Sequence, residues 1–132
     1  MFFEIEINTH SNTEFIDITD MIRGKTAEAK ISDGTCLVFV PHTTAAVTIN
    51  ENADPDVTAD IIRALEKKIP QNDGDYRHSE GNSAAHIKSS LLGSSVIVII
   101  ENGRLKLGTW QGVYLCEFDG PRRRKVWLKF LR

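Results

Sequence analysis

The sequence predicts an α+β domain, a mainly antiparallel β-sandwich with two or three helices packed on it. Three observations support this class. Much of the chain consists of short apolar stretches with the two-residue period of strands, two central stretches have a helical apolar face, and an Asn-Gly pair marks a hairpin. The 132 residues fit a single domain, which we expect to span residues 1–132.

Four strands are expected in the first half of the chain, at residues 3–7, 15–18, 36–40 and 45–50. In the first of them Phe3, Ile5 and Ile7 alternate with glutamates, as in a strand with one buried face. The third is a continuous apolar run after a turn, and the fourth alternates again. The two cysteines lie in such runs, so we expect buried, reduced thiols.

Two strand pairs are expected in the second half. Residues 96–100 and 105–107 flank Asn102-Gly103, and Asn-Gly favours a type I′ turn because both central residues need positive φ. Residues 113–118 and 126–131 flank Asp119-Gly120-Pro121, and we expect them to form the second pair.

The first helix is expected after Asp54, which provides an N-cap, with Pro55 at the first helical position. Pro70 stops it. Its apolar face consists of four residues spaced one turn apart: Val57, Ile61, Leu65 and Ile69.

The second helix is expected to start at Asn82 or Ser83 and to end at Gly93. Its expected apolar face consists of Ala84, Ile87 and Leu91.

Composition excludes several classes of function. The net charge of −2 argues against a large nucleic-acid interface. The longest apolar run, residues 96–100, is far too short to cross a membrane. The N-terminus lacks the pattern of a signal peptide, so a cytoplasmic location is expected.

Polar residues concentrate in two segments, and these contain three of the four histidines. One segment has His42, Thr43 and Thr44 after a strand, and the other runs from His78 through Glu80 and Asn82 to His86. On one helix, His78 and His86 would be roughly 12 Å apart. They converge only if a turn at Gly81 folds His78 back over the helix start.

Two kinds of site fit these residues. Convergence of His42, His78 and His86 would suit zinc or a related divalent metal, with Glu80 orienting a ligand or moving a proton. Alternatively, the helix start at 81–83 binds an anion through its free N–H groups. Arg104, Lys106 or the basic run 122–125 would then add charge.

Two further groups of residues have both a structural and a functional interpretation. Glu51 and Asp54 either cap the first helix or belong to the site. Trp110 and Gln111 lie between Gly108 and Gly112, in a bulge or as a pocket wall on which a flat ligand stacks.

Four motifs in order resemble the YjbQ-like family, also called the secondary thiamine-phosphate synthase family. They are Pro41–Ala45, Asn50–Pro55, Glu80–Asn82 with Ala85-His86, and Leu107–Gln111, and the resemblance continues through Cys116–Arg122. It implies an α+β fold, a homotrimer, and a polar pocket that binds a metal ion or an anion.

The resemblance also implies roles for individual residues. His42, His78 and His86 would bind the metal or act in catalysis. Glu51, Asp54, Glu80 and Asn82 would surround them, and Thr43, Thr44, Trp110 and Gln111 would contact substrate.

The implied activity is a weak thiamine-phosphate synthase reaction, which joins a pyrimidine diphosphate to a thiazole phosphate with loss of pyrophosphate. We therefore expect a small enzyme that acts on a phosphorylated small molecule or inorganic anion. Two alternatives remain: a non-catalytic protein that binds a metal or phosphometabolite, and a metal-dependent hydrolase.

Overall fold

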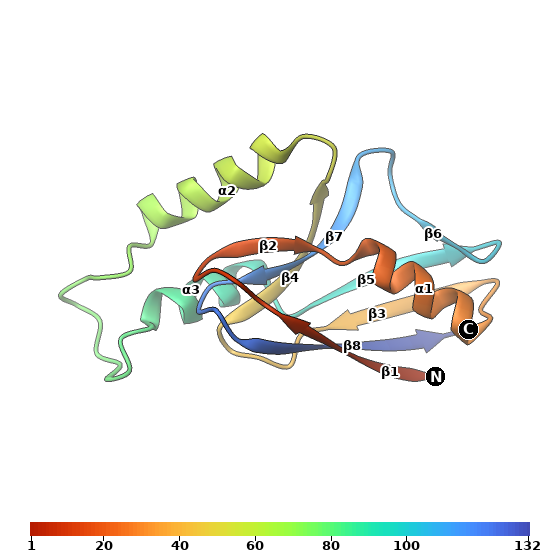
Figure 1. Ribbon diagram of the computed structural model, residues 1–132, viewed down its shortest axis with the longest axis horizontal. Helices are drawn as coiled ribbons and strands as arrows, with labels where there is room; N and C mark the ends of the chain where they lie inside the picture. The colour runs from red at the N-terminus through yellow and green to blue at the C-terminus, as the bar shows by residue number, and fades with distance from the viewer.

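Residues 1–132 form eight strands and three helices in the computed structural model (Figure 1). In chain order the elements are β1 (Phe2–Asn8), β2 (Glu14–Asp17), α1 (Thr19–Ala29), β3 (Gly34–Phe39), β4 (Ala45–Glu51), α2 (Pro55–Lys68), α3 (Ser83–Leu92), β5 (Ser95–Glu101), β6 (Arg104–Lys106), β7 (Gln111–Glu117) and β8 (Arg123–Leu131). A five-stranded sheet has the order β1-β8-β3-β5-β6, and a three-stranded sheet has the order β2-β7-β4. All pairings are antiparallel, which confirms the predicted α+β class.

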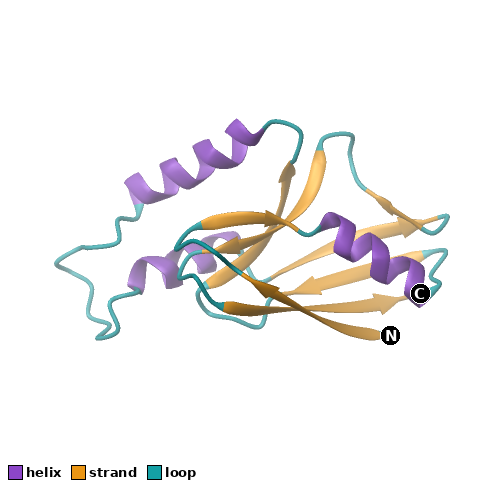
Figure 2. Ribbon diagram, viewed as in Figure 1, coloured by secondary structure: helices purple, strands orange, loops and turns teal.

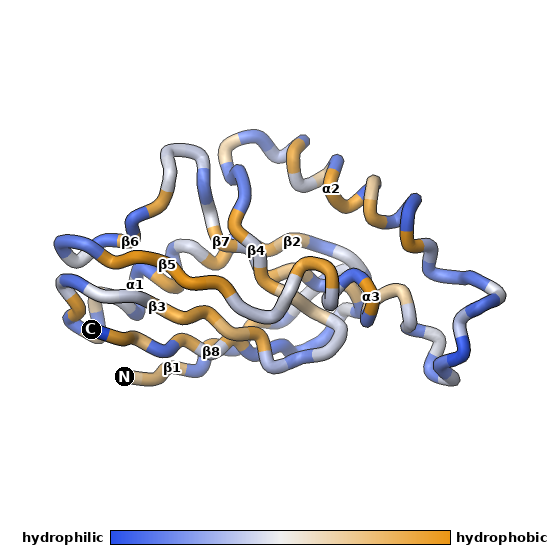
Figure 3. The backbone as a smooth tube through the Cα atoms, turned by 180° about the vertical axis from the view of Figure 1, so that it is seen from behind, coloured by the Kyte–Doolittle hydropathy of each residue, from blue (hydrophilic) through white to orange (hydrophobic).

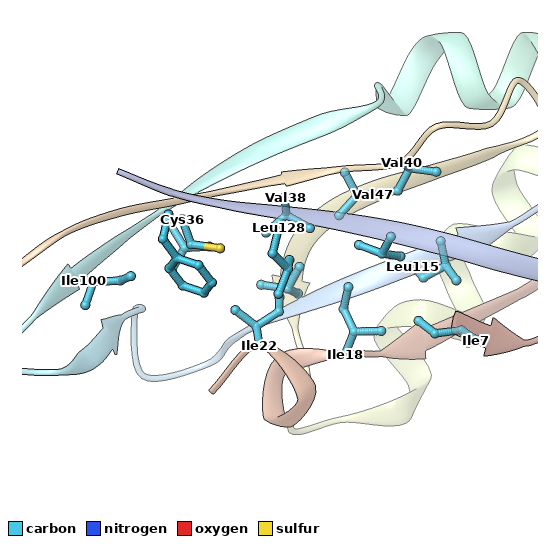
Figure 4. Packing of buried hydrophobic residues seen from close by; sticks show 14 of the residues in the cluster. Ile7, Ile18, Ile22, Cys36, Val38, Val40, Val47, Ile100, Leu115 and Leu128 are labelled. Carbon is cyan, nitrogen blue, oxygen red and sulfur yellow. The ribbon is translucent and has the colours of Figure 1, made fainter. Parts of the chain in front are cut away.

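The main core lies between the two sheets, with α1 closing one side. Figure 4 shows Val38 and Leu128 of the large sheet facing Leu115 of the small sheet, with Ile22 of α1 beside them. Cys36 is also in this core, and both cysteines are free and buried, as predicted. A second, smaller cluster around Phe118 packs between the small sheet and α3.

The three helices differ in how they attach to the sheets. Helix α3 packs along β4, and α1 contacts β6, β7 and β8. Helix α2 has no buried residue and stands away from the sheets (Figure 2), with its four predicted apolar residues half-buried. None of the three helices combines the length and apolarity that spanning a bilayer requires.

Most predicted strands occur where expected, and the hairpin is confirmed. Asn102 and Gly103 both have positive φ, and Glu101 pairs with Arg104 across the two-residue turn. The predicted pairing of 113–118 with 126–131 is wrong. Strand β7 lies between β2 and β4, whereas β8 lies between β1 and β3, so the connection at 119–122 passes from one sheet to the other.

Two predictions about helices also differ from the structure. Helix α1 was not expected, because its buried positions Thr19, Ile22, Thr26 and Ala29 include two polar residues. The predicted apolar face of α3 is wrong for Ile87 and Leu91, which are exposed. The alanine side of α3 is buried instead, because small side chains allow the helix to lie close to β4.

The chain ends and the polar segments that contain the three histidines lie at opposite ends of the molecule. The amide of Phe130 donates a hydrogen bond to the Met1 carbonyl (2.9 Å), so the two termini are adjacent (Figure 1). At the other end β3 and β7 finish, β4 and β8 begin, and α3 starts. The polar segments of the sequence meet there.

Candidate functional site

A polar pocket of about 460 Å³ lies at the end of the sheets beside α3. Residues 41–44 of the β3–β4 connection form one wall, and Asp119, Arg122 and Arg124 of the β7–β8 segment form another. The third wall consists of His78, Glu80, Asn82 and His86. We call this the histidine pocket. Apart from Pro41 its lining is entirely polar, which packing alone does not require.

Arg124, which lines the histidine pocket, forms a buried ion pair with Glu117. The guanidinium of Arg124 donates hydrogen bonds to both carboxylate oxygens of Glu117, from Nε at 2.8 Å and from Nη2. Arg124 Nη2 also donates to the Thr44 hydroxyl (2.9 Å) and carbonyl (3.2 Å), and Thr9 Oγ1 donates to Glu117 (2.7 Å). This network fixes the positions of four strand ends relative to one another.

Asp119 connects the rim of the pocket to α3. Its carboxylate accepts hydrogen bonds from Asn82 Nδ2 (2.9 Å) and Arg122 Nη2 (3.0 Å), and its carbonyl accepts from Arg122 Nε (2.8 Å). Arg122 Nη1 makes no hydrogen bond within the chain. Asn82 is the N-cap of α3, but its side chain makes no capping bond, so the N–H groups of Ser83 and Ala84 keep their donor capacity, whereas the Ala85 N–H donates to the Asn82 carbonyl (3.1 Å).

The turn at Gly81 folds His78 back toward the helix, as predicted. Gly81 has a φ of 74°, and the His78 and His86 rings lie edge to face with centroids 5.3 Å apart. Glu80 Oε2 is 4.0 Å from His78 Nε2. The structure therefore places two imidazoles and a carboxylate together at the mouth of the pocket.

His42 is held by strand β8. The backbone N–H of Lys125 donates a hydrogen bond to His42 Nε2 (2.9 Å). In the neutral ring the proton must then be on Nδ1, which makes that atom a donor. Burial and the nearby charge of Arg124 lower the pKa of His42, although the Glu117 carboxylate opposes this shift. The imidazole is therefore neutral at pH 7.

A three-histidine metal centre does not fit this geometry. No group of three His, Cys, Asp or Glu side chains is arranged to hold a metal ion. His42 has no free lone pair, because Nε2 accepts the Lys125 N–H and Nδ1 has the proton. The positive charge of Arg124 beside it also disfavours a cation.

Seven of the predicted site residues meet in the histidine pocket, and four do not. His42, Thr43, Thr44, His78, Glu80, Asn82 and His86 line it. Glu51, Asp54, Trp110 and Gln111 are at the other end of β4 and β7. Ala45 pairs with Glu117 beside the pocket, whereas Glu51 pairs with Gln111 six residues further on, or roughly 20 Å away.

The residues at this far end have their own contacts. Asp54 caps α2 by accepting a hydrogen bond from Asp56 N (2.9 Å). Gln111 Oε1 accepts from Gly108 N (2.8 Å), which closes the turn that presents Trp110. The indole of Trp110 is 62% exposed, so it forms no pocket wall within one chain.

Sequence reasoning did not single out Glu117 or Asp119. The sequence does contain a signal for Glu117, because it is the one charged residue in the apolar run 113–118. A carboxylate buried with that run requires a cationic partner. Arg122 and Arg124 belong to the basic run that was considered as a phosphate clamp. Only these two of its four residues line the pocket, because alternate residues of β8 face opposite sides.

Comparison with known proteins gives consistent matches. Residues 3–132 match the family described as UPF0047 protein YjbQ-like. A UPF0047 protein of Methanocaldococcus jannaschii is 51% identical over 131 residues, which cover 99% of this chain and 94% of that protein. The UPF0047 protein YugU of Bacillus subtilis is 51% identical over 127 residues, covering 96% of each chain.

Solved structures of relatives have the same fold. An uncharacterized YjbQ/UPF0047 family protein of Clostridium acetobutylicum has a TM-score of 0.95 and 58% identity, covering 98% of this chain and 99% of that one. A conserved hypothetical protein of Thermus thermophilus has a TM-score of 0.91 and 41% identity, with coverage of 98% and 99%.

Proposed function

This chain belongs to the YjbQ-like UPF0047 family, and from that premise we propose that it is a small enzyme acting on a phosphorylated molecule in the histidine pocket. The reaction would be of the secondary thiamine-phosphate synthase type. One observation supports this proposal above the others: the pocket combines three imidazoles, two guanidiniums and the start of a helix. These are the groups that bind phosphate and move protons.

The phosphate would bind between Arg122 and the first turn of α3. Arg122 has an unused Nη1, and the helix start offers N–H donors and the positive end of a dipole. Arg124 is already engaged by Glu117. It would therefore attract the phosphate through its positive charge, without a free pair of N–H donors to bind it. Asp119 and Glu80 limit the positive charge, which favours release of the anion after reaction.

His42 acts as a donor in this proposal. Its Nδ1–H would bond an oxygen of the leaving pyrophosphate and stabilise the charge that develops there as the C–O bond breaks. The thiazole nitrogen carries no hydrogen, so its attack forms the thiazolium directly and releases no proton. His86, beside the His78–Glu80 pair, would instead transfer a proton to the departing pyrophosphate.

A homotrimer is part of the proposal, and exposed apolar residues support self-association. Strand β5 is hydrophobic along its length (Figure 3), yet its Ile97 and Ile99 are 65% and 56% exposed, and Leu91 on α3 is 66% exposed. Because Trp110 and Gln111 are remote from the histidines of their own chain, they would contact the substrate's flat ring from a neighbouring copy. Light scattering should give three times the 14.8 kDa chain mass. The monomer mass would contradict this part.

The proposal places the enzyme in the cytoplasm. Cys36 and Cys116 are free and buried, which fits a compartment where thiols stay reduced.

The main test compares binding with turnover. Purified protein would be titrated with inorganic pyrophosphate and assayed for thiamine phosphate from the two phosphorylated precursors. Arg122→Gln should weaken pyrophosphate binding, and His86→Ala should remove turnover while leaving binding. Lys129→Gln, on the same strand as Arg124 but remote from the pocket, is the matched control. Saturable binding without product would favour a non-catalytic phosphometabolite-binding protein.

A divalent metal, such as zinc, is the cofactor that the resemblance implies. Only His78 and His86 would hold it, since His42 is engaged by Lys125, and the close approach of these two rings is the observation that favours it. Elemental analysis of protein purified without metal-affinity steps tests the point. One metal per chain, with chelation abolishing activity, would favour the metal-dependent hydrolase or a metal-binding role instead.

A further inference from the structure

We propose that a second, uncharged subsite adjoins the histidine pocket and takes a hydroxylated group of the ligand, so that the principal substrate is a phosphorylated sugar or polyol. This inference rests on the proposed phosphate site. It extends that proposal by naming the chemistry of the rest of the molecule.

A second hollow of about 460 Å³ is lined by α3, by the β3–β4 connection and by the residues between α3 and β5. It shares His42, Thr43 and His86 with the histidine pocket, so the two hollows are contiguous. A ligand whose phosphate is near Arg122 would therefore pass over both imidazoles and enter this hollow. The bond next to the phosphate would lie beside the groups that move protons.

The chemistry of the two hollows differs. The histidine pocket has Arg122, Arg124, Glu80 and Asp119, whereas the second hollow has no Arg, Lys, Asp or Glu. Beyond the shared residues it is lined by three serines, a glycine and one apolar residue: Ser89, Ser90, Ser94, Gly93 and Ala45. We call it the serine hollow. A flat apolar ring would need aromatic or aliphatic walls, and Ala45 is the one aliphatic residue of the serine hollow.

The hydroxyl groups of serine and threonine are well matched to those of a sugar for hydrogen bonding. A serine or threonine hydroxyl donates one hydrogen bond and accepts two, and so does each hydroxyl of a sugar. Ser89, Ser90, Ser94 and Thr43 therefore match a chain of neutral hydroxyls better than they match a second anion, for which no cationic side chain is present.

Ser89 supplies an independent observation. Its side chain is more than nine-tenths buried, at 8% exposure, and its Oγ has no hydrogen-bond partner. The only other such side-chain atom in the protein is Asn82 Oδ1, at the start of α3. Asn82, His86 and Ser89 are spaced four and three residues apart, so they share one face of the helix.

The neighbouring serine shows what Ser89 lacks. Ser90 Oγ donates to the His86 carbonyl (2.9 Å), which is the usual way a helical serine satisfies its hydroxyl. Ser89 makes no such bond. Ser89 lines the hollow, and a rotation about its single side-chain torsion would let Oγ meet a ligand hydroxyl that supplies the missing partner.

Calorimetric titration with inorganic phosphate and with ribose 5-phosphate tests the inference. Ribose 5-phosphate should bind at least about tenfold more tightly, since several hydroxyl bonds are added. Ser89→Ala should lose about 3- to 10-fold in affinity for ribose 5-phosphate and nothing for phosphate. Ser95→Ala, which removes the hydroxyl of an exposed serine that lines neither hollow, is the matched control and should change both affinities by less than about twofold.

Other outcomes would refute the inference. Equal affinity for phosphate and ribose 5-phosphate would mean that the serine hollow contributes no binding. An equal loss of both affinities in Ser89→Ala, with a lower melting temperature or an altered oligomer mass, would assign Ser89 a structural role. Failure of phosphate itself to bind the parent protein would instead remove the proposed phosphate site, on which this inference depends.

Discussion

Replacing Glu117 by glutamine should strongly destabilise the protein. Glu117 is completely buried and accepts hydrogen bonds from Thr9 Oγ1 (2.7 Å), the Asp119 N–H (3.1 Å) and the Arg124 guanidinium. A neutral amide leaves the buried guanidinium without its counter-charge. Breaking one side of a buried pair costs about 3–5 kcal/mol. Because the whole stability of such a domain is about 5–15 kcal/mol, the change removes a large share of it.

Urea and thermal unfolding measure this effect directly. At about 3–5 °C per kcal/mol for a chain of this size, the melting temperature should fall by roughly 10–25 °C. Glu101→Gln is the matched control, because Glu101 forms an ion pair with Lys106 (3.5 Å) in which both side chains are more than half exposed. Such a pair contributes at most about 1 kcal/mol.

The pH dependence provides a second readout. Burial alone would raise the pKa of Glu117, but hydrogen bonds from Arg124, Thr9 and the Asp119 N–H outweigh it and hold the pKa below 4.5. The stabilising contribution is therefore complete above pH 4.5 and is lost as the pH falls through the lowered pKa. The stability difference between the parent and Glu117→Gln should shrink in that acidic range.

Either of two results would refute this reasoning. A loss below about 1 kcal/mol in Glu117→Gln would mean that water or rearrangement satisfies Arg124. The double variant Glu117→Leu/Arg124→Met should be more stable than Glu117→Gln, because it leaves no charge uncompensated. A double variant that is less stable would show that packing, and not charge, determines the cost.

Four further predictions follow from single contacts. Burial and the charge of Arg124 lower the pKa of His42, so His42 should titrate below pH 6.5 in NMR spectra, and its contribution to stability, complete above pH 6.5, should be lost as the pH falls through its lowered pKa; a higher midpoint would contradict the burial of His42 beside Arg124. Gly34→Ala should cost at least about 2 kcal/mol in urea unfolding, since its Cβ would lie 2.1 Å from the Leu131 carbonyl oxygen, whereas Gly74→Ala meets nothing and should be neutral. Asp54→Ala should cost about 1 kcal/mol and speed amide exchange in α2, and slow exchange there would contradict the cap. Burial raises the pKa of Cys36 to about 12, so iodoacetamide should label it at pH 8 only in denaturant.

The strands were predictable because each has a local pattern, but their partners were not. Alternation in residues 3–7 and the Asn102-Gly103 turn are local signals, and both led to correct elements. The separation of β7 and β8 into different sheets depends on contacts with β1, β3, β2 and β4, which no local pattern contains. Helix α1 was missed because Thr19 and Thr26 occupy buried positions that a hydrophobicity pattern assigns to solvent.

The site was predictable to the extent that its residues are close in sequence. The Gly81 turn brought His78 to His86 as expected, because a few neighbouring residues determine the geometry. The link between Arg124 and Thr44 joins positions 80 residues apart, and neither residue type signals it. For the same reason the sequence grouped Glu51 with His42, although β4 separates them by most of its length.

The adjacent termini have a practical consequence. Met1 and Phe130 are joined by a backbone hydrogen bond at the end of the molecule away from α3 (Figure 1). A tag or an anchoring linker at either terminus would therefore leave the molecule at the end opposite the histidine pocket. A protein attached to a sensor surface in this way would expose the histidine pocket to solution. Immobilised in this way, the protein can be screened against a collection of sugar phosphates without obstruction by its own attachment.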